Sequence, residues 1–365
     1  SDVCSSDLKA LILVGGFGTR LRPFTFTKAK PLVEFCNLPI VFHQLRALSE
    51  IGVKQVILAV SYMPQQMVDA IPFIKENYGI DIIISVEDIP MGTAGPIALA
   101  RKYLEDEDVF FVFNSDVSCT YPLKKLLEFH KKHGKEGTIA VTTVTDPSKY
   151  GVVVADETGL IDRFVEKPKE YVGNHINAGI YVFTPSILKR IPSKPTSIER
   201  DIFPIMAKDK ELYSIVLDGF WMDIGQPKDF VAGTALYLDF IRQTKEEVND
   251  SKFATGEGFQ GNVLLHSSAQ IGAGCTIGPN VVIGEGVRVG DHCVIQNSTI
   301  MSRSVIDEDC VIEESIVGWH NHVNKGARLL RTYTGDDVTV KSNVSLEDYH
   351  IAPNKSVSES NPVVK

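Results

Sequence analysis

A six-residue repeat in the last third of the chain constrains the fold more than any other feature. An aliphatic side chain returns every six positions, and a second row with the same spacing starts at Cys275; the first row is Ile271, Ile277, Ile283, Val289 and Ile295. A glycine follows each of the first four, at Gly272, Gly278, Gly284 and Gly290. This period is typical of a parallel β-helix, whose aliphatic side chains point inward and whose glycines let the chain turn at corners.

The register of the repeat changes after Ile295, and apolar pairs then resume at 305–306, 311–312 and 316–317. Two repeats could arise by chance, but this many cannot. We therefore predict a left-handed parallel β-helix of hexapeptide repeats over residues 261–350. The remaining residues, 351–365, are predicted to form a polar C-terminal tail.

The first two thirds of the chain alternate apolar strands with amphipathic helices. The pattern predicts strands over 9–14, 55–60, 80–86 and 109–113, with helices over 39–51, 64–78 and 94–104 between them. Such alternation favours an α/β domain with a doubly wound, mostly parallel, Rossmann-like sheet, here assigned to residues 8–240. More closely spaced strands over 138–144, 151–155, 161–166 and 178–183 predict an antiparallel extension. A polar stretch marks the boundary, and 241–260 is predicted to be a linker.

Charge and composition exclude several classes of partner. The formal net charge of the 365 residues is −9, and no run of Lys and Arg stands out, so neither nucleic acid nor an anionic membrane surface is an expected partner. The chain lacks the roughly 20-residue apolar run of a membrane span, and its first seven residues lack the apolar stretch of a signal peptide. The six cysteines show no zinc spacing, and we expect reduced thiols in a cytoplasmic protein.

A glycine-rich turn directly follows the first predicted strand. It runs from Gly15 through Gly16 and Gly18 to Arg20, and Lys30 lies shortly after it. Glycines let backbone N–H groups approach phosphate oxygens, and nearby cations neutralise their charge. The turn has neither the Gly-Lys-Ser/Thr of a P-loop nor the G-x-G-x-x-G of dinucleotide-binding proteins. It therefore predicts a phosphate-binding site of another kind.

Two aspartates could hold a divalent metal ion. Asp116 follows the apolar strand 109–113, where a parallel sheet opens to its ligands, and Asp223 lies in an aromatic and glycine-containing context, F-W-M-D-I-G. Two carboxylates together with substrate phosphates suit Mg²⁺, which prefers hard oxygen ligands and octahedral geometry. Read without further context, Asp116 could instead cap a turn and Asp223 could pair with a lysine.

The turn resembles the signature of the sugar-nucleotide pyrophosphorylases, G-G-x-G-T-R-L-R-P-x-T followed by Lys-Pro. The resemblance extends from Lys9 over essentially the whole chain and includes C-N-x-P-I, N-S-D-V, P-S-K-Y-G-V-V, F-V-E-K-P, I-N-A-G, P-T-S-I-E and F-W-M-D-I-G-Q-P-K-D-F. It implies an enzyme that condenses a sugar 1-phosphate with a nucleoside triphosphate and releases pyrophosphate. The family usually has Pro-Lys-Pro where this chain has Ala29-Lys30-Pro31. The cation is kept, and we expect a looser loop.

The resemblance also implies a role for individual residues. Arg20 and Lys30 address the triphosphate, Lys167 addresses the sugar phosphate, and Asp116 and Asp223 position Mg²⁺. Binding of the nucleotide and the sugar falls to Leu13, Gly15, Gly16, Gly18, Thr19, Glu87, Gly92, Thr93, Asn114, Gly151, Glu166 and Asn177. Among these, Glu166 and Asn177 are expected at sugar hydroxyls, and Gly151 is expected to leave room for the sugar ring.

Glu87 suggests which base is bound. It stands where relatives that take uracil or thymine often have Gln, at the matching offset from Gly92. Guanine presents N–H donors at N1 and N2, and one ionised carboxylate can accept from both. Within the family the motifs resemble the GDP-mannose-forming, beta-type branch, which implies GTP and mannose 1-phosphate as substrates.

Other interpretations remain open. A related enzyme for UTP and glucose 1-phosphate would share the phosphate and metal residues. A catalytically silent regulatory subunit could have the same two domains, although the retained charged residues argue against it. An acyltransferase, with bases among His292, His320 and His322, would explain a β-helix but not the N-terminal motifs. The β-helix is expected to serve assembly, in a homo-oligomer or with a regulatory alpha-type subunit.

Overall fold

The computed structural model describes residues 8–360. The predictions for the first seven residues, Cys4 among them, and for 361–365 lie outside the described residues. The chain forms two compact units, one made of the residues up to Phe17 and Val41–Trp221, the other of Gly18–Ile40 and the residues from Met222 onward. Among the described residues, no helix combines the length and the apolar character that a membrane span requires.

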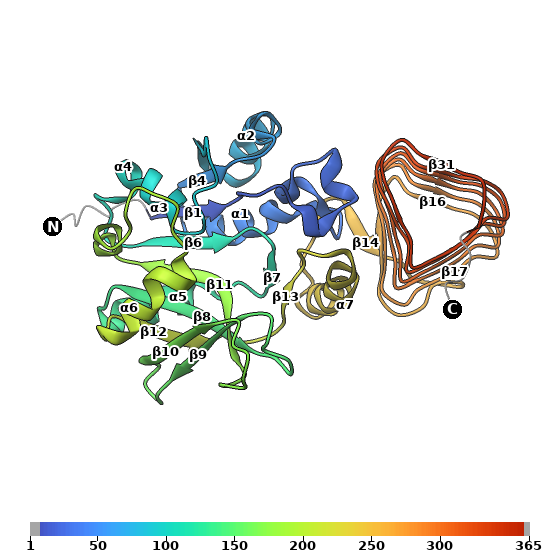
Figure 1. Cartoon of the computed structure of the whole chain (residues 1–365). Helices are drawn as coiled ribbons and strands as arrows, with labels where there is room; N and C mark the ends of the chain where they lie inside the picture. Colours follow the sequence, from blue (N-terminus) through green and yellow to red (C-terminus); the bar gives the residue numbers. More distant parts are fainter. Residues whose placement is uncertain (1–7, 361–365) are drawn as a thin grey trace. The chain divides into compact units, whose positions relative to one another are not determined.

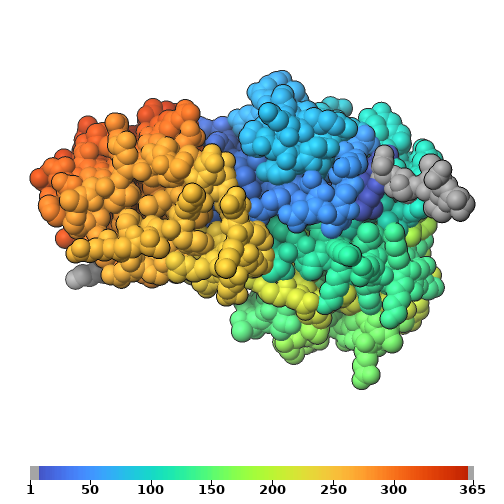
Figure 2. All heavy atoms as spheres, turned by 180° about the vertical axis from the view of Figure 1, so that it is seen from behind, coloured from blue at the N-terminus to red at the C-terminus, as the bar shows by residue number. Residues whose placement is uncertain are grey.

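A nine-stranded sheet forms the first unit (Figure 1). Four neighbouring strands are parallel, in the order β6-β1-β4-β5. Their bounds are β1 (Lys9–Leu13), β4 (Gln55–Val60), β5 (Asp81–Val86) and β6 (Phe110–Asn114). The helices between them are α1 (Ile40–Glu50), α2 (Pro64–Tyr78), α3 (Gly95–Leu99) and α4 (Arg101–Leu104); α2 lies on the surface of this unit in Figure 2. The predicted doubly wound sheet is confirmed.

The predicted antiparallel extension is also present. β11 (His175–Phe183) pairs antiparallel with β6 and with β8 (Gly137–Thr143), and β9 (Gly151–Ala155) pairs antiparallel with β10 (Ile161–Glu166). β12 (Leu212–Val216) closes this side of the sheet by pairing parallel with β8. The extension therefore mixes both kinds of pairing.

Helices differ from the sequence prediction in several places, and neither α5 (Leu123–His133) nor the later helices α6 (Phe203–Lys208) and α7 (Pro227–Thr244) were predicted. The helix predicted over 94–104 divides at Ala100, whose ψ of 1° lies outside the helical range, into α3 and α4. The sequence analysis left out α5 although its buried side chains recur at helical spacing, at Leu123, Leu126 and His130. The shorter α6 packs beside β10.

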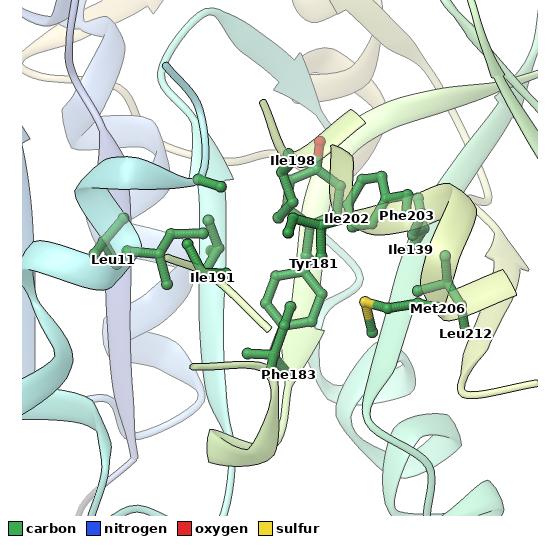
Figure 3. Packing of buried hydrophobic residues seen from close by; sticks show 14 of the residues in the cluster. Leu11, Ile139, Tyr181, Phe183, Ile191, Ile198, Ile202, Phe203, Met206 and Leu212 are labelled. Carbon is green, nitrogen blue, oxygen red and sulfur yellow. The ribbon is translucent and has the colours of Figure 1, made fainter. Parts of the chain in front are cut away.

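Aliphatic and aromatic side chains together fill the core of the first unit (Figure 3). Tyr181 and Phe183 on β11 are fully buried, and their rings lie 5.3 and 6.2 Å from that of Phe203 on α6. Ile139 and Leu212 belong to the same cluster. Burying each side chain of this size stabilises the fold by about 1.5–3 kcal/mol. The cluster therefore fixes β11, which carries the predicted sugar-binding residue Asn177, and its neighbour β8.

The second unit contains α7 (Pro227–Thr244) and the predicted parallel β-helix, whose triangular section is visible in Figure 1 and whose outer surface is orange to red in Figure 2. The first sheet holds β15 (Val263–His266), β18 (Val281–Ile283), β21 (Thr299–Ile300), β24 (Ile316–Val317), β27 (Tyr333–Thr334) and β30 (His350–Ile351). The second holds β16 (Gln270–Ile271), β19 (Arg288–Val289), β22 (Val305–Ile306), β25 (His322–Val323), β28 (Thr339–Val340) and β31 (Ser356–Val357). The third holds β17 (Thr276–Ile277), β20 (Val294–Gln296), β23 (Val311–Glu313), β26 (Arg328–Leu330) and β29 (Ser345–Glu347).

The coils continue to Val357, and one strand precedes them. β14 (Ser251–Phe253), within the polar stretch that the sequence analysis assigned to a linker, pairs antiparallel with β15. β31 at the other end falls in the stretch assigned to the tail. Inward-facing aliphatic side chains of all three sheets form one buried cluster, which is what the six-residue period requires.

A shorter corner explains the change of register after Ile295. Val263 pairs with Val281, in a coil of 18 residues, whereas Thr299 pairs with Ile316, in a coil of 17. The residue is lost between the third and first sheets, where Asn297 takes a left-handed conformation with φ of 46°. Glu314, Arg331 and Asp348 repeat this conformation in the following coils.

The glycines of the repeat have a different role from the predicted one. Of the four, Gly278 alone has a positive φ. At Gly284 and Gly290 a Cβ would instead lie 2.8 and 2.6 Å from backbone nitrogens of the next coil, at Ser302 and Glu308. These glycines therefore allow the close approach of successive coils rather than the turning of a corner.

We expect Gly290→Ala to destabilise the second unit by about 1–3 kcal/mol, because backbone of the next coil must move to admit the methyl group. Thermal unfolding followed by circular dichroism measures the change. Gly173→Ala is the control, since its Cβ would make an ordinary 3.6 Å contact with Val152. Equal unfolding midpoints for both variants and the wild type would contradict this role for Gly290.

Candidate active site

The carboxyl ends of the four parallel strands bring several predicted residues of the first unit to one edge. Leu13, the last residue of β1, lies in register with Ala59 of β4 and Asn114 of β6. The glycine turn, Glu87 and Asp116 follow the ends of β1, β5 and β6 along the chain. Because parallel strands end at the same edge of a sheet, these residues lie where ligands of such sheets bind.

Glu87 is a buried carboxylate with one unused oxygen. Its Oε2 accepts a hydrogen bond from the Met91 N–H (3.1 Å), whereas its buried Oε1 has no hydrogen-bond partner among the described residues. A Cβ on Gly15 would lie 3.0 Å from Oε1. Burial raises the pKa of Glu87, and the Met91 hydrogen bond opposes the rise. An unpartnered buried acceptor is costly unless a ligand supplies a donor.

The glycine turn is tied to β4 through a residue that the sequence analysis missed. The Gly16 N–H donates to Oγ of Ser61, which directly follows β4, at 2.8 Å. Gly16 has a φ of 95°, a conformation that other residues rarely adopt. Hydroxyl side chains after strands are common, so nothing in the sequence marked Ser61.

Gly92 and Thr93 contact another segment of the same unit. A Cβ on Gly92 would lie 2.5 Å from the carbonyl oxygen of Thr196, and the φ of Gly92 is 73°. The Thr93 hydroxyl donates to Glu199 (2.6 Å) and accepts from the Ile198 N–H (2.8 Å). Both residues therefore hold the P-T-S-I-E segment beside the loop that follows Glu87. A nucleotide contact of Thr93 stays a prediction.

Asn114 is fixed from two sides. Its carbonyl accepts a hydrogen bond from Gln44 on α1 (2.8 Å), and Gly179 of β11 packs against its side chain, where a Cβ would lie 2.8 Å from Nδ2. Gly179, with a φ of 76°, is the glycine of I-N-A-G. The end of β6, two residues before Asp116, is thus held in a defined position.

The predicted sugar-binding residues meet on β9, β10 and β11. Glu166 lies opposite Gly151 in the antiparallel pair, and Lys167 Nζ lies 3.6 Å from Oε1 of Glu166. Burial and the carboxylate of Glu199 raise the pKa of Glu166. The missing Cβ of Gly151 makes room for side chains of this chain, since it would lie 2.5 Å from Phe164 and 2.9 Å from Glu166. This is its direct structural role, and a contact with sugar remains a prediction.

Asn177 is oriented by its neighbours on β11. Its Nδ2 donates to the Tyr181 hydroxyl (2.8 Å), and its Oδ1 accepts from the Gly179 N–H (2.9 Å). The side-chain amide can therefore adopt one orientation, with a second N–H hydrogen remaining for another acceptor. Glu199 and Tyr181 complete the surroundings, and neither was singled out from the sequence.

The remaining predicted residues belong to the second unit. Gly18 begins the 3₁₀ turn Thr19–Leu21, and its carbonyl accepts hydrogen bonds from the Leu21 N–H (2.9 Å) and the Thr25 hydroxyl (2.8 Å). Its φ is 62°, and a Cβ would lie 2.9 Å from Thr25. Gly18 of the signature is therefore required for its left-handed backbone conformation, which starts the turn that carries Arg20.

Arg20 and Asp223 lie close together within the second unit. Nη1 of Arg20 lies 3.5 Å from Oδ2 of Asp223, while Oδ1 of Asp223 accepts from the Gly225 N–H (2.9 Å). Asp223 ends β13 (Trp221–Asp223), just before α7. The Asp223 side chain is 20% exposed and that of Arg20 54%, so both are accessible to a charged ligand.

Ala29 keeps the backbone conformation that a proline would impose. Its φ of −58° and ψ of 134° fall in the range that proline favours, and Lys30 starts the 3₁₀ turn Lys30–Leu32 directly after it. The departure from Pro-Lys-Pro therefore removes a constraint on the loop without changing its path.

The donor set fits a divalent metal ion only with help from substrate. No group of three or more His, Cys, Asp or Glu residues in the described part of the chain could hold a metal ion. Carboxylates such as Asp116 and Asp223 supply hard oxygen donors of the kind that Mg²⁺ and Mn²⁺ prefer. Substrate phosphates would have to complete the coordination.

Residues 9–239 match the Nucleotidyl transferase family. Residues 259–364 match the family described as the GMPPB C-terminal domain. The chain therefore belongs to the nucleotidyltransferases and, by its curated relatives, to the mannose-1-phosphate guanylyltransferase family. Members of this family generally use a divalent metal ion, and their substrates are a nucleotide and a sugar phosphate.

Two relatives illustrate the similarity. The mannose-1-phosphate guanylyltransferase catalytic subunit beta of Drosophila pseudoobscura pseudoobscura is 53% identical over 97% of this chain and 95% of its own. The mannose-1-phosphate guanyltransferase of Aspergillus oryzae is 52% identical over 97% and 98%. Among solved structures, HddC from Yersinia pseudotuberculosis has a TM-score of 0.52 at 29% identity and covers 62% of this chain and 97% of its own.

Proposed function

We propose that the protein forms GDP-mannose and pyrophosphate from GTP and mannose 1-phosphate. The observation that carries this proposal is the similarity to mannose-1-phosphate guanylyltransferases at 50–53% identity over 97% of the chain. The unused buried oxygen of Glu87 supports guanine as the base. The retained set of charged residues argues for an active enzyme rather than a silent subunit.

In the proposed reaction a phosphate oxygen of mannose 1-phosphate attacks the α-phosphorus of GTP in line, and pyrophosphate leaves from the opposite side. That oxygen is already ionised at neutral pH, so no general base or covalent nucleophile is needed. Catalysis then depends on positioning and on neutralising charge around phosphorus. We assign Arg20 and Lys30 to the triphosphate and Lys167 to the sugar phosphate.

We assign Asp116 and Asp223 to the metal ion and take Mg²⁺ as that ion. When bound, it would withdraw charge from the phosphate oxygens and favour the departure of pyrophosphate. Arg20, 3.5 Å from Asp223, would offset the carboxylate charge before substrate arrives. Asp223 is oriented by the Gly225 N–H, which leaves Oδ2 as the oxygen directed at Arg20 and at a ligand.

Base recognition is assigned to Glu87. Oε1 would accept from one N–H of guanine, and the remaining lone pair of Oε2 could accept from the other. Two donors favour the ionised carboxylate and so offset the raised pKa of Glu87. A pyrimidine or adenine edge would leave the carboxylate poorly paired. HddC, a structural relative, has been solved in complex with GMP-PN.

The other assignments follow the strand ends. Leu13 at the end of β1, the turn residues Gly15, Gly16, Gly18 and Thr19, and Gly92, Thr93 and Asn114 are proposed to bind the nucleotide. Glu166 and Asn177 are proposed to bind sugar hydroxyls, beside Gly151.

We further propose a cytoplasmic enzyme that assembles into a homo-oligomer or with an alpha-type subunit. The five cysteines in the described part of the chain are free and buried, as expected in a reducing compartment. In the described β-helix, β29, β30 and β31 end their sheets without a further strand, and such edges favour association with another chain.

Pyrophosphate release from GTP and mannose 1-phosphate, with Mg²⁺ and with chelator, tests the proposed function. We expect release that depends on both substrates and is abolished by chelation. UTP with glucose 1-phosphate is the second arm. Faster release in that arm would overturn the assignment of substrates. No release in either arm would contradict the proposed enzymatic activity.

Glu87→Gln tests whether Glu87 recognises the base of the nucleotide. Loss of a charge-assisted hydrogen bond costs about 1.5–3 kcal/mol, so kcat/KM for GTP should fall roughly 10- to 150-fold while that for UTP changes little. Asp88→Asn, at the exposed neighbouring residue, serves as the control. A GTP/UTP ratio that stays at the wild-type value would rule Glu87 out as the residue that recognises the base.

Asp223→Asn tests the metal assignment. We expect kcat to fall by about 10² or more at saturating Mg²⁺, because an amide donates no negative charge to the ion, while the thermal unfolding midpoint changes little. Asp218→Asn is the matched control at an exposed aspartate of the same segment, where the side chain pairs with Lys125. Wild-type turnover in Asp223→Asn would remove the assignment.

A further inference from the structure

Trp319 is a buried aromatic residue of the β-helix that contacts the segment 18–40. It lies between β24 and β25 and is 3% exposed. Its indole Nε1–H donates to Oε2 of Glu34 at 2.7 Å, although the two residues are 285 positions apart. Glu34 begins β2 (Glu34–Phe35), in the segment 18–40 that also carries Arg20 and Lys30.

A lysine closes the contact. Nζ of Lys28 lies 2.9 and 3.0 Å from the two carboxylate oxygens of Glu34, and 4.1 Å from the centroid of the Trp319 ring. Trp319 therefore makes two contacts with the ion pair: its N–H donates a hydrogen bond to Glu34, and its ring faces the ammonium group of Lys28. Lys28 and Glu34 flank Lys30 on either side.

Trp319 also contacts the N-terminal part of the segment 18–40, through Phe24. Phe24, fully buried, packs edge-on against Trp319 with centroids 6.2 Å apart, and also contacts Phe230 of α7 at 6.5 Å. The next residue, Thr25, holds the carbonyl of Gly18 and thereby the turn that carries Arg20. Both predicted triphosphate cations thus lie a few residues from a contact with Trp319.

The β-helix in turn holds Trp319. The Trp319 carbonyl accepts hydrogen bonds from Asn321 Nδ2 (2.7 Å) and from the Asp337 N–H of the following coil (2.9 Å). Trp319 is thus fixed by the hydrogen bonds of the β-helix, and its side chain in turn restrains the short 3₁₀ turns of the segment 18–40.

We propose that Trp319 is a positioning residue for the triphosphate, which it serves by fixing the segment 24–34 and, through it, Arg20 and Lys30. The inference rests on the proposed function in that those two cations meet GTP. Its consequence is that the C-terminal domain contributes to nucleotide affinity. Lys167, which is assigned to the sugar phosphate, lies in the first unit, outside the segment that Trp319 holds.

Trp319→Phe and Trp319→Leu separate the two parts of the contact. Phe keeps an aromatic face for Phe24 and Lys28 but lacks the N–H to Glu34, and Leu lacks both. We expect KM for GTP to rise about 3- to 10-fold in the Phe variant and further in the Leu variant, with KM for mannose 1-phosphate within about twofold of wild type. Tyr333→Phe, which removes one polar group from a buried aromatic residue one coil away, should leave both values unchanged.

Glu34→Gln shows whether the effect runs through this contact. Combined with Trp319→Phe, it should raise KM for GTP by less than the product of the two single effects, since Glu34→Gln weakens the hydrogen bond that Trp319→Phe removes. Multiplicative effects, or an equal rise in KM for both substrates, would mark Trp319 as a structural residue and overturn the proposal.

Calorimetric binding of GTP without sugar phosphate keeps this test independent of the proposed reaction. Weaker GTP binding in Trp319→Phe supports the positioning role even if mannose 1-phosphate proves not to be the acceptor. Wild-type GTP affinity in a folded Trp319→Phe variant overturns it, whether or not Trp319→Leu folds.

Discussion

Parallel pairing of β1 with β4 and β6 determines where the functional side chains of the first unit lie. Since parallel strands all end at one edge, a glycine turn after β1, a carboxylate after β5 and another after β6 come to the same edge from segments far apart in the chain. Backbone spacing does this without any contact among the side chains themselves. The core around Tyr181 and Phe203 then holds the antiparallel strands, with Glu166 and Asn177, in the same sheet, where β11 pairs with β6.

Charged groups of the second unit are held by buried contacts rather than by regular secondary structure. The segment 18–40 consists of short 3₁₀ turns and a two-residue hairpin, which would be mobile alone. Phe24 and Phe35 pack against Phe230, and Trp319 closes the other side. A triphosphate site needs cations at fixed positions, because each must counter charge that develops at phosphorus. We therefore propose that the β-helix contributes to the chemistry through Trp319, besides its proposed part in assembly.

Local periodicity in the sequence predicts the fold, but features that depend on contacts between distant segments cannot be predicted from it. The β-helix was predicted because its inward residues recur every six positions. The corner at Asn297, which is shorter by one residue than in the first coil, and the close approach at Gly290 depend instead on the neighbouring coil. Glu87 was found from its offset to Gly92, whereas its unused oxygen is visible only in the folded chain. Ser61 and Trp319 belong to none of the motifs, and Glu199 ends P-T-S-I-E without a role that the sequence assigns to it. All three matter through hydrogen bonds to partners far along the chain, which no local pattern shows.

We propose that carboxylates from distant segments, Asp116 and Asp223, hold one divalent ion together with the phosphates of the nucleotide. Anomalous diffraction from crystals grown with Mn²⁺ and a non-hydrolysable GTP analogue tests it most directly. We predict a single ion with an oxygen of each aspartate at about 2.1 Å and phosphate oxygens completing an octahedron. An ion that contacts neither aspartate, or separate ions at the two, would contradict the account.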